Sequence, residues 1–430
     1  MSADRSEDQS ESANQPAPKN TRSGQVHSRS GQVHSRSGGG HVLAVRPIAP
    51  DQLAAAVVEL RGSFLQTPAW GRTKPEWRQT PLGWFDPAGA LVGAGLVLSR
   101  HIPRLGRSFA YLPEGPTLPW DAVSADPSAW LDPLVEWARQ DSAFALRLGF
   151  PVVSRRWAPD PVKKQIGEVG LMSFTDLPPT FDNPVARRLD TWLDGGGWKP
   201  IGWGNTAAVG QPRYVCIVDL EGRTADSVLK AMNQQWRRNI KKAAKAGVEV
   251  RTTDLEGVAT FHDLYAETAE RDHFFPRAKS YFEQMMGAFG DGAHERISAH
   301  IYEAHLDGDV LASALMVRVG DMFSYLYGGS TSRNREARAS NALQWQAIRD
   351  ALEAGCTAYD LRGFNTSLGA TSPLTGLLLF KLGAGADVVE YVGERELVLS
   401  RFWHTAFEKA MALRVAINNR RAGATTESEV

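Results

Sequence analysis

Five of the ten residues from Trp236 to Lys245 are lysine or arginine, in a chain with 48 basic and 48 acidic residues overall. On a helix of 3.6 residues per turn, the apolar residues of this segment share one face and the cations cover the remainder. Gly247 is a natural helix end, and Val248–Val250 then alternates like a strand. Such a helix can hold phosphate groups, and the alternative is a solvated surface helix without a ligand. The apolar face would consist of Trp236, Ile240, Ala243 and Ala244.

Motifs for covalent or metal-dependent catalysis do not occur in the sequence. There is no Ser-His-Asp order, no cysteine with a partner histidine, no P-loop and no Gly-x-Gly-x-x-Gly. No set of histidines, cysteines and acids has the spacing of metal ligands; His262 and His273, for example, lie eleven residues apart without a suitable acid. Each histidine is therefore expected to be a surface or capped imidazole, and the sequence assigns neither a catalytic residue nor a metal.

The composition is that of a globular protein with balanced charge, so any anion-binding site must be local. A chain of 430 residues can form two domains with separate cores. No apolar run reaches the roughly 18 residues that span a bilayer, and the polar N-terminus has no signal-peptide core. Cys216 and Cys356 are the only cysteines, which excludes a disulfide framework. These features predict a cytoplasmic protein, and the balanced charge argues against a general nucleic-acid-binding coat.

Both ends of the chain are expected to be disordered. Residues 1–40 are rich in Ser, Gly, Gln and Arg, and they contain a seven-residue repeat that begins at Arg22. The repeat has no apolar pair, so it cannot form a coiled coil or bury enough surface to offset the entropy of ordering. Its histidines, His27 and His34, together with His41, are a weak alternative as metal ligands. Residues 416–430 are predicted to be a second disordered tail.

The ordered part is predicted to contain one mixed α/β plan twice. In the first half, the dipeptide Thr67-Pro68 starts a helix that carries Trp70, Lys74 and Trp77, although Pro75 suggests a kink or an early end. The other elements expected in that half are a helix at 53–60, a hairpin of strands 82–85 and 91–98, a strand at 109–112 and a helix at 130–140. The elements expected in the second half are strands at 213–220, 299–305, 310–319, 322–327 and 358–362, and helices at 227–246, 260–271, 281–289 and 341–354.

Several motifs occur in an order that is typical of one protein family. They are Phe64–Trp70 with Lys74 and Trp77, Tyr111–Pro116, Gln211–Tyr214, Arg271 through Phe282, Tyr325–Ser330, Tyr359–Gly363 and Phe380 through Gly393. With the basic segment at 236–248, they resemble the FemABX family, the tRNA-dependent aminoacyltransferases of peptidoglycan cross-bridge synthesis. Each motif alone is weak, but the ordered set extends over roughly residues 42 to 412.

The resemblance implies an α/β fold of two tandem GNAT-like (acyl-CoA N-acyltransferase-like) domains. The first would comprise 41–165 and 395–415, and the second 166–394. The final helix, 401–413, would return to pack on the first domain. No long heptad insertion separates the helices at 260–271 and 281–289, so we expect the compact subtype without a coiled-coil arm.

The implied reaction is transfer of an amino acid from aminoacyl-tRNA to the stem peptide of a peptidoglycan precursor, either UDP-MurNAc-pentapeptide or lipid II. In this aminolysis the ester is already activated, so the protein must orient the substrates, accept a proton and stabilise an oxyanion. Aminoacyl-tRNA is a co-substrate, and no cofactor is implied. Two alternatives remain, an acyl-CoA-dependent N-acyltransferase and an inactive homologue that binds tRNA or precursor.

The resemblance also suggests which residues bind the substrates. Lys74 would anchor the precursor diphosphate and Arg237 would grip its phosphate, with Arg238 as a close rival for that position. The other precursor-binding residues would be Trp70, Trp77, Tyr111 and Tyr327. Arg238, Lys241, Lys242 and Lys245 would bind the tRNA backbone.

Three positions depart from the family pattern. Glu114 stands where Arg is usual, Pro119 where an Asp is usual, and Asp321 near a lysine position of some relatives. Tyr325 and Tyr327 are expected to share one strand face, and Asp360 is expected to pair with Arg362.

The protein is expected to be a monomer, and a lipid-linked acceptor would bring it into peripheral contact with the inner membrane leaflet.

Overall fold

The computed structural model describes residues 43–102, 104–169, 177–201, 210–292, 294–364 and 373–413. The two predicted tails, the seven-residue repeat and its histidines lie outside the described residues. Residues 41–430 form one compact unit, and everything below concerns that unit.

One mixed sheet of fourteen strands runs through the described part of the chain, in the order β1-β2-β3-β4-β5-β14-β8-β13-β12-β11-β10-β9, with β6 beside β5 and β7 beside β14. The strands of the first half are β1 Ala44–Pro47, β2 Arg78–Phe85, β3 Leu91–Ile102, β4 Arg107–Leu112, β5 Ala143–Trp157, β6 Phe181–Asp182 and β7 Lys199–Pro200. The strands that follow are β8 Tyr214–Asp219, β9 Glu249–Thr253, β10 Ile297–Leu306, β11 Asp309–Val319, β12 Met322–Ser330, β13 Ala358–Gly363 and β14 Asp387–Val398.

The same topology occurs twice. In the first half β2, β3 and β4 are antiparallel neighbours, and helix α4 (Pro127–Gln140) then crosses over to β5, which pairs parallel with β4. In the second half β10, β11 and β12 repeat the antiparallel order, and α11 (Ala339–Glu353) crosses over to β13, parallel to β12. The predicted duplication and the tandem GNAT-like plan are therefore confirmed.

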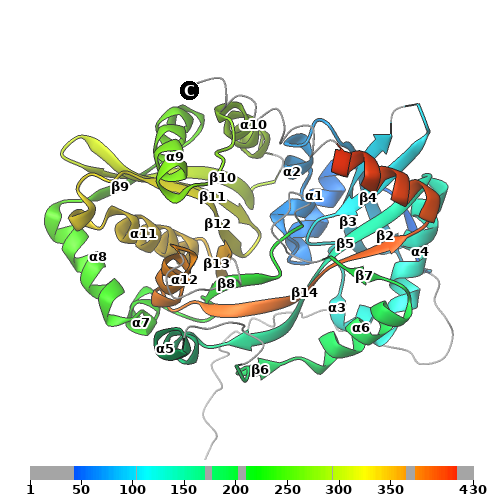
Figure 1. Ribbon diagram of the computed structural model, residues 1–430, viewed down its shortest axis with the longest axis horizontal. Helices are drawn as coiled ribbons and strands as arrows, with labels where there is room; N and C mark the ends of the chain where they lie inside the picture. The colour runs from blue at the N-terminus through cyan, green and yellow to red at the C-terminus, as the bar shows by residue number, and fades with distance from the viewer. Residues whose placement is uncertain are drawn as a thin grey trace, which may run out of the picture. The chain divides into compact units, whose positions relative to one another are not determined.

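Strand β14 joins the two halves. It pairs antiparallel with β5 of the first half and with β8 of the second, and in Figure 1 it is the long orange strand that runs between them. The sequence analysis did not predict this strand. Both faces of the sheet are covered at this strand, so its side chains are buried almost continuously and it lacks the alternation of burial that marks a strand with one exposed face.

Helices cover both faces of the sheet and enclose three main cores. The remaining helices are α1 Pro50–Glu59, α2 Pro68–Arg72, α3 Trp120–Ala125, α5 Pro159–Val169, α6 Pro184–Gly195, α7 Ala225–Ala231, α8 Gln234–Ala246, α9 Val258–Asp272, α10 Lys279–Gly290 and α12 Pro373–Gly383. One core joins the halves, because α1 and α2 pack with α9 and α10 in a single apolar cluster. The predicted limits between the domains stay a prediction, although α6, assigned to the second domain, packs in the core of the first half.

Residues 273–278 connect α9 directly to α10, so the expected absence of a coiled-coil arm there is confirmed. The final helix, 401–413, packs on the first half as expected. Phe407 stacks on Phe109 with ring centroids 5.8 Å apart and also contacts Phe144. Among the described residues, no helix has the length and apolar character needed to cross a membrane.

Three local predictions were wrong. Helix α2 ends at Arg72, so Lys74 follows the helix instead of lying on it; Pro75 prevents continuation. The helix expected at 227–246 is two helices, because the Asn233 side chain accepts a hydrogen bond from the Trp236 backbone and caps α8. Ala244 is exposed, so the apolar face of α8 is narrower than predicted.

Tyr325 and Tyr327 were also predicted wrongly to share one face. The pairing of β12 with β11 shifts register between Leu315 and Met316, and this irregularity sends the two rings into different cores. The backbone of α9 lies very close to Gly329, since a Cβ there would collide with the backbone of Leu264 and Tyr265.

Candidate functional site

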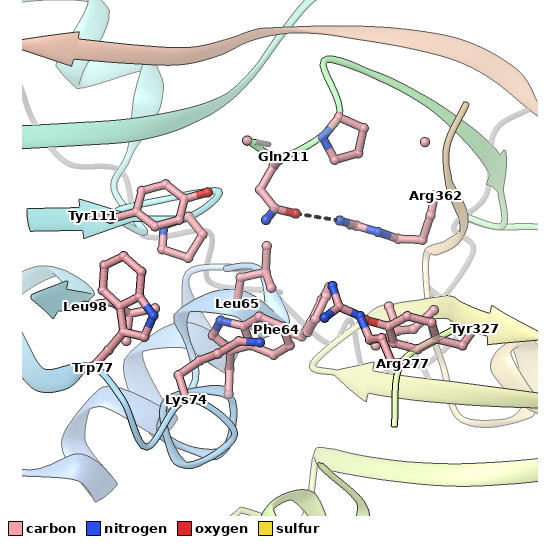
Figure 2. Close-up of a pocket in the computed structure, with 16 residues that line it drawn as sticks. Phe64, Leu65, Lys74, Trp77, Leu98, Tyr111, Gln211, Arg277, Tyr327 and Arg362 are labelled. Atoms are coloured by element: carbon pink, nitrogen blue, oxygen red, sulfur yellow. Dashed lines mark hydrogen bonds between the residues drawn. The ribbon is translucent and has the colours of Figure 1, made fainter. Parts of the chain in front are cut away.

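A cavity of about 380 Å³ lies between the two halves (Figure 2). It brings together five of the predicted substrate-binding residues, namely Trp70, Lys74, Trp77, Tyr111 and Tyr327. Segments far apart in sequence meet here, including the turn after α2, the strand β4, the loop before α10 and the ends of β12 and β13. The other residues that line it are Phe64, Leu65, Leu98, Pro113, Gly210, Gln211, Pro212, Arg277, Leu326, Arg362 and Gly363.

Lys74 is held between two aromatic rings from different halves. Its Nζ lies 4.4 Å from the ring centroid of Trp70 and 4.7 Å from that of Tyr281, and it is 3.4 Å from the Tyr281 hydroxyl. The Arg277 guanidinium lies 4.7 Å from the centroid of the same Tyr281 ring. In the described part of the chain, neither cation forms an ion pair with a carboxylate. Both therefore remain available to an anion.

The pKa of Lys74 reflects its burial first and the neighbouring positive charge second. Burial, and next the charge of Arg277, lower the pKa of Lys74 to about 8, against a smaller opposing effect of Glu76. Two neighbouring cations that form no ion pair repel each other, and a bound phosphate would relieve that repulsion. The geometry is that of an anion site, with Arg277 able to bind two oxygens at once and Lys74 acting as a point charge.

Aromatic rings form the walls of the cavity. Trp77 packs against Phe109 and Tyr111, with ring centroids 6.4 Å away in both cases. On the side of the second half, the Tyr327 hydroxyl lies 3.3 Å from that of Tyr281. These rings offer flat apolar surfaces with hydroxyl groups at their edges, which suits a ligand with both polar and apolar parts.

A buried ion-pair network closes the base of the cavity and links the halves. Arg362 binds Glu114 of the first half at 2.7 Å and Asp360 of its own strand at 3.0 Å, so the predicted Asp360–Arg362 pair is confirmed. Arg362 also donates to the Gln211 side chain at 3.4 Å, the dashed contact in Figure 2. Glu114, at the position that departs from the family pattern, thus has a structural partner. The buried Lys381 ammonium donates to the carbonyls of Arg362 and Gly363 and holds this segment in place.

The predicted phosphate-binding Arg237 and the predicted tRNA-binding cations do not line this cavity. Arg237 donates to the backbone carbonyls of Lys230 and Met232, at the end of α7, where a cation complements unpaired carbonyls. Its role as a phosphate ligand stays a prediction. The tRNA-binding candidates lie exposed on α8 and form no ion pair within the described residues; they are Arg238, Lys241, Lys242 and Lys245.

The sequence analysis did not select Arg277, Tyr281 or Gln211 individually, although all three lie in or between quoted motif residues. A signal existed for the first two. Arg277 lies four residues before Tyr281, in the loop that leads into α10, and its guanidinium lies over the ring of Tyr281. Among the described residues, no group of three or more His, Cys, Asp or Glu side chains is arranged to hold a metal ion.

Comparison with known proteins identifies the family. The model of the FemAB family matches residues 191–301 and 294–410, which together extend over about half of the chain. The chain belongs to the FemAB family. Similar curated proteins are the lipid II:glycine glycyltransferases of Staphylococcus aureus strains MRSA252 and USA300. Each is 23% identical over 410 residues, covering 79% of this chain and 89% of the relative.

The fold is shared with a solved structure of the same family. The crystal structure of FemX aligns with a TM-score of 0.70 and 21% sequence identity, covering 85% of this chain and 99% of FemX. This FemAB family member therefore has the FemX fold, and the expected resemblance is confirmed.

Proposed function

We propose that this protein transfers an amino acid from aminoacyl-tRNA to the stem peptide of a peptidoglycan precursor. Membership of the FemAB family and the similarity to lipid II:glycine glycyltransferases support an aminoacyltransferase of cross-bridge synthesis. The observation that carries the proposal is the unneutralised pair Lys74 and Arg277 at a cavity between the halves. A diphosphate, present in both the nucleotide-linked and the lipid-linked precursor, supplies the charge that this pair lacks.

The cavity can promote the reaction by orienting the two substrates. The precursor diphosphate would be fixed by the two cations, so the stem peptide extends along the aromatic walls toward Tyr111 and Arg362. An activated ester needs no protein nucleophile, and holding amine and ester together supplies most of the acceleration. The hydroxyl groups and guanidinium of the cavity provide donors to an oxyanion. Aminoacyl-tRNA acts as a co-substrate in this scheme, and no cofactor is required.

The test is an assay of the full chain with total charged tRNA and either UDP-MurNAc-pentapeptide or lipid II, read by product mass. A precursor heavier by one amino acid is the expected product. Acetyl-CoA without tRNA should give no product; acetyl transfer at a comparable rate would instead favour the N-acyltransferase alternative. No turnover, together with retained tRNA or precursor binding, would indicate the inactive homologue.

Precursor affinity should weaken as the pH rises above about 8. Lys74 must be charged to bind an anion, and its pKa is lowered to about 8 in the free protein. Below that pH the ammonium is charged, and above it binding must first take up a proton. Titration calorimetry of the wild type and Lys74→Arg across this range tests the expectation. The arginine variant stays charged and should lose the Lys74 contribution to the pH dependence; equal pH dependence in both proteins would contradict the assignment.

Reversing three charges on α8 should weaken tRNA use while leaving precursor affinity nearly unchanged. Lys241, Lys242 and Lys245 are exposed and do not line the cavity. Each phosphate contact releases about 0.7–0.9 counterions, so the triple glutamate variant should flatten the salt dependence of the KM for tRNA. A matched control reverses three exposed cations on other elements, Arg188, Lys199 and Lys409. An unchanged salt slope in the α8 variant would make that helix a solvated surface only.

Peripheral membrane contact and a monomeric state are part of the same proposal. Phe402 and Leu105 are 72% and 48% exposed, and Arg104 and Arg401 are exposed basic residues beside them in sequence. Exposed apolar groups flanked by cations suit the surface of an anionic bilayer. The lipid II arm of the assay, run with the acceptor in vesicles, tests whether this surface gives the lipid-linked precursor an advantage.

A further inference from the structure

Strand β14 carries three buried glutamates, and one of them forms no ion pair with any residue that the structure describes. Glu390 is paired with Arg155 and Arg213, and Glu396 with Arg147 and His404. Glu394, 6% exposed, forms no ion pair within the described part of the chain. A carboxylate that is buried without forming an ion pair is costly, so its retention indicates a function rather than a contribution to stability.

The hydrogen bonds of Glu394 connect it to the cavity. Its Oε1 accepts from the Tyr111 hydroxyl, which lines the cavity, and from the Gln211 backbone N–H at 3.0 Å. Its Oε2 is buried and has no hydrogen-bond partner among the residues that the structure describes. Gly210, also in the cavity wall, lies so close to Oε2 that a Cβ there would collide with it.

We propose that Glu394, acting through the Tyr111 hydroxyl, accepts the proton that the attacking amine releases during aminoacyl transfer. This inference rests on the proposed function. Glu394 touches no substrate atom and is a positioning residue: it orients the phenol and takes the phenolic proton, while Tyr111 contacts the amine.

The proton transfers and bond changes of this step balance without an added reactant. The neutral amine forms an N–C bond with the ester carbonyl carbon, and its N–H proton passes to the Tyr111 oxygen as the Tyr111 proton passes to Glu394. The bond between the carbonyl carbon and the tRNA ribose oxygen then breaks. That oxygen receives the proton back along the same path, so the peptide product and the free tRNA leave Glu394 ionised.

The acid–base properties of the pair agree with this path. Burial raises the pKa of Glu394 above the ordinary range of a glutamate, which makes it a stronger base than an exposed carboxylate. Burial, and next the charge of Glu394, raise the pKa of Tyr111 well above its usual value. Tyr111 therefore stays a neutral phenol in the resting protein. It accepts the amine proton only as its phenolic proton passes to Glu394.

The experiment compares the wild type with Glu394→Gln, Tyr111→Phe and the double variant, using charged tRNA and precursor. Glu396→Gln is the matched control, because Glu396 is equally buried on the same strand but its hydrogen bonds go to Arg147 and His404, which do not line the cavity. Glu394→Gln should lower kcat by about 10²–10⁴-fold with KM for the precursor changed less than about twofold, and should remove the acidic limb of the kcat/KM profile. The double variant should be no slower than the slower single variant, since the two groups act as one unit.

A second measurement is independent of turnover. Infrared difference spectra of the full chain across the acidic pH range should contain a carboxyl band that titrates above the ordinary glutamate range, and Glu394→Gln should abolish it. Wild-type kcat and pH profile in Glu394→Gln, or an equal loss in Glu396→Gln, would overturn the proton path while leaving the proposed function intact. No product from the wild type would overturn both.

Discussion

Replacing Lys74 or Arg277 with alanine is expected to raise the KM for the precursor by about 10- to 150-fold while leaving the fold intact. Each change removes a charged contact to phosphate worth about 1.5–3 kcal/mol, and each 1.4 kcal/mol corresponds to a tenfold change. Neither cation is engaged in an ion pair within the described residues, so the folded protein loses little. Steady-state kinetics at varied precursor concentration, with melting temperatures for each variant, measure both effects.

Two further alanine variants make this test discriminating. Lys279 lies two residues beyond Arg277 but does not line the cavity and already pairs with Glu283 at 3.5 Å, so Lys279→Ala should leave KM unchanged. Arg237→Ala tests the sequence-based prediction that Arg237 binds the precursor phosphate, as an alternative to Arg277. A large rise in KM for Arg237→Ala, with none for Arg277→Ala, would return the phosphate-binding role to α8.

Replacing Arg362 with alanine should destabilise the protein by about 3–5 kcal/mol, the effect of removing one partner from a buried ion-pair network. Glu114 and Asp360 would then face each other without a counter-charge, at the contact that links the two halves. Chemical denaturation of this variant and of Arg187→Ala provides the comparison. Arg187 pairs with Asp182 at an exposed site, and its loss should cost no more than about 1 kcal/mol.

The stability of the Arg362→Ala variant should depend on pH in a defined direction. Burial already raises the pKa of Asp360, and Arg362 opposes this effect. Without Arg362 the folded protein would bind more protons than the unfolded chain in the weakly acidic range. Its stability should therefore rise as the pH falls from neutrality toward the raised pKa, relative to the wild type. Restoration of stability in Arg362→Ala with Glu114→Gln would confirm that the unpaired charges cause the loss; equal stability in all variants would contradict it.

Local patterns in the sequence were sufficient to predict the repeated fold. Apolar periodicity and turn residues such as Asp307-Gly308 depend on neighbours in the chain, so the β10–β11 hairpin and the duplicated order of elements followed from them. Trp70, Lys74 and Trp77 were instead selected through the resemblance to the FemABX family, and all three line the cavity. The split between α7 and α8 was missed because a cap at Asn233 competes with otherwise continuous helical periodicity.

Only the tertiary structure decided which groups face one another across the cavity. Lys74 meets Tyr281, 207 residues away, Arg362 meets Glu114 over 248 residues, and Glu394 meets Tyr111 over 283 residues. These contacts depend on β14 joining β5 to β8 and on α1 and α2 packing with α9 and α10. Residue types and local spacing limit what each group can do, but the pairing of charges that defines the site comes from strand order and core packing between distant segments.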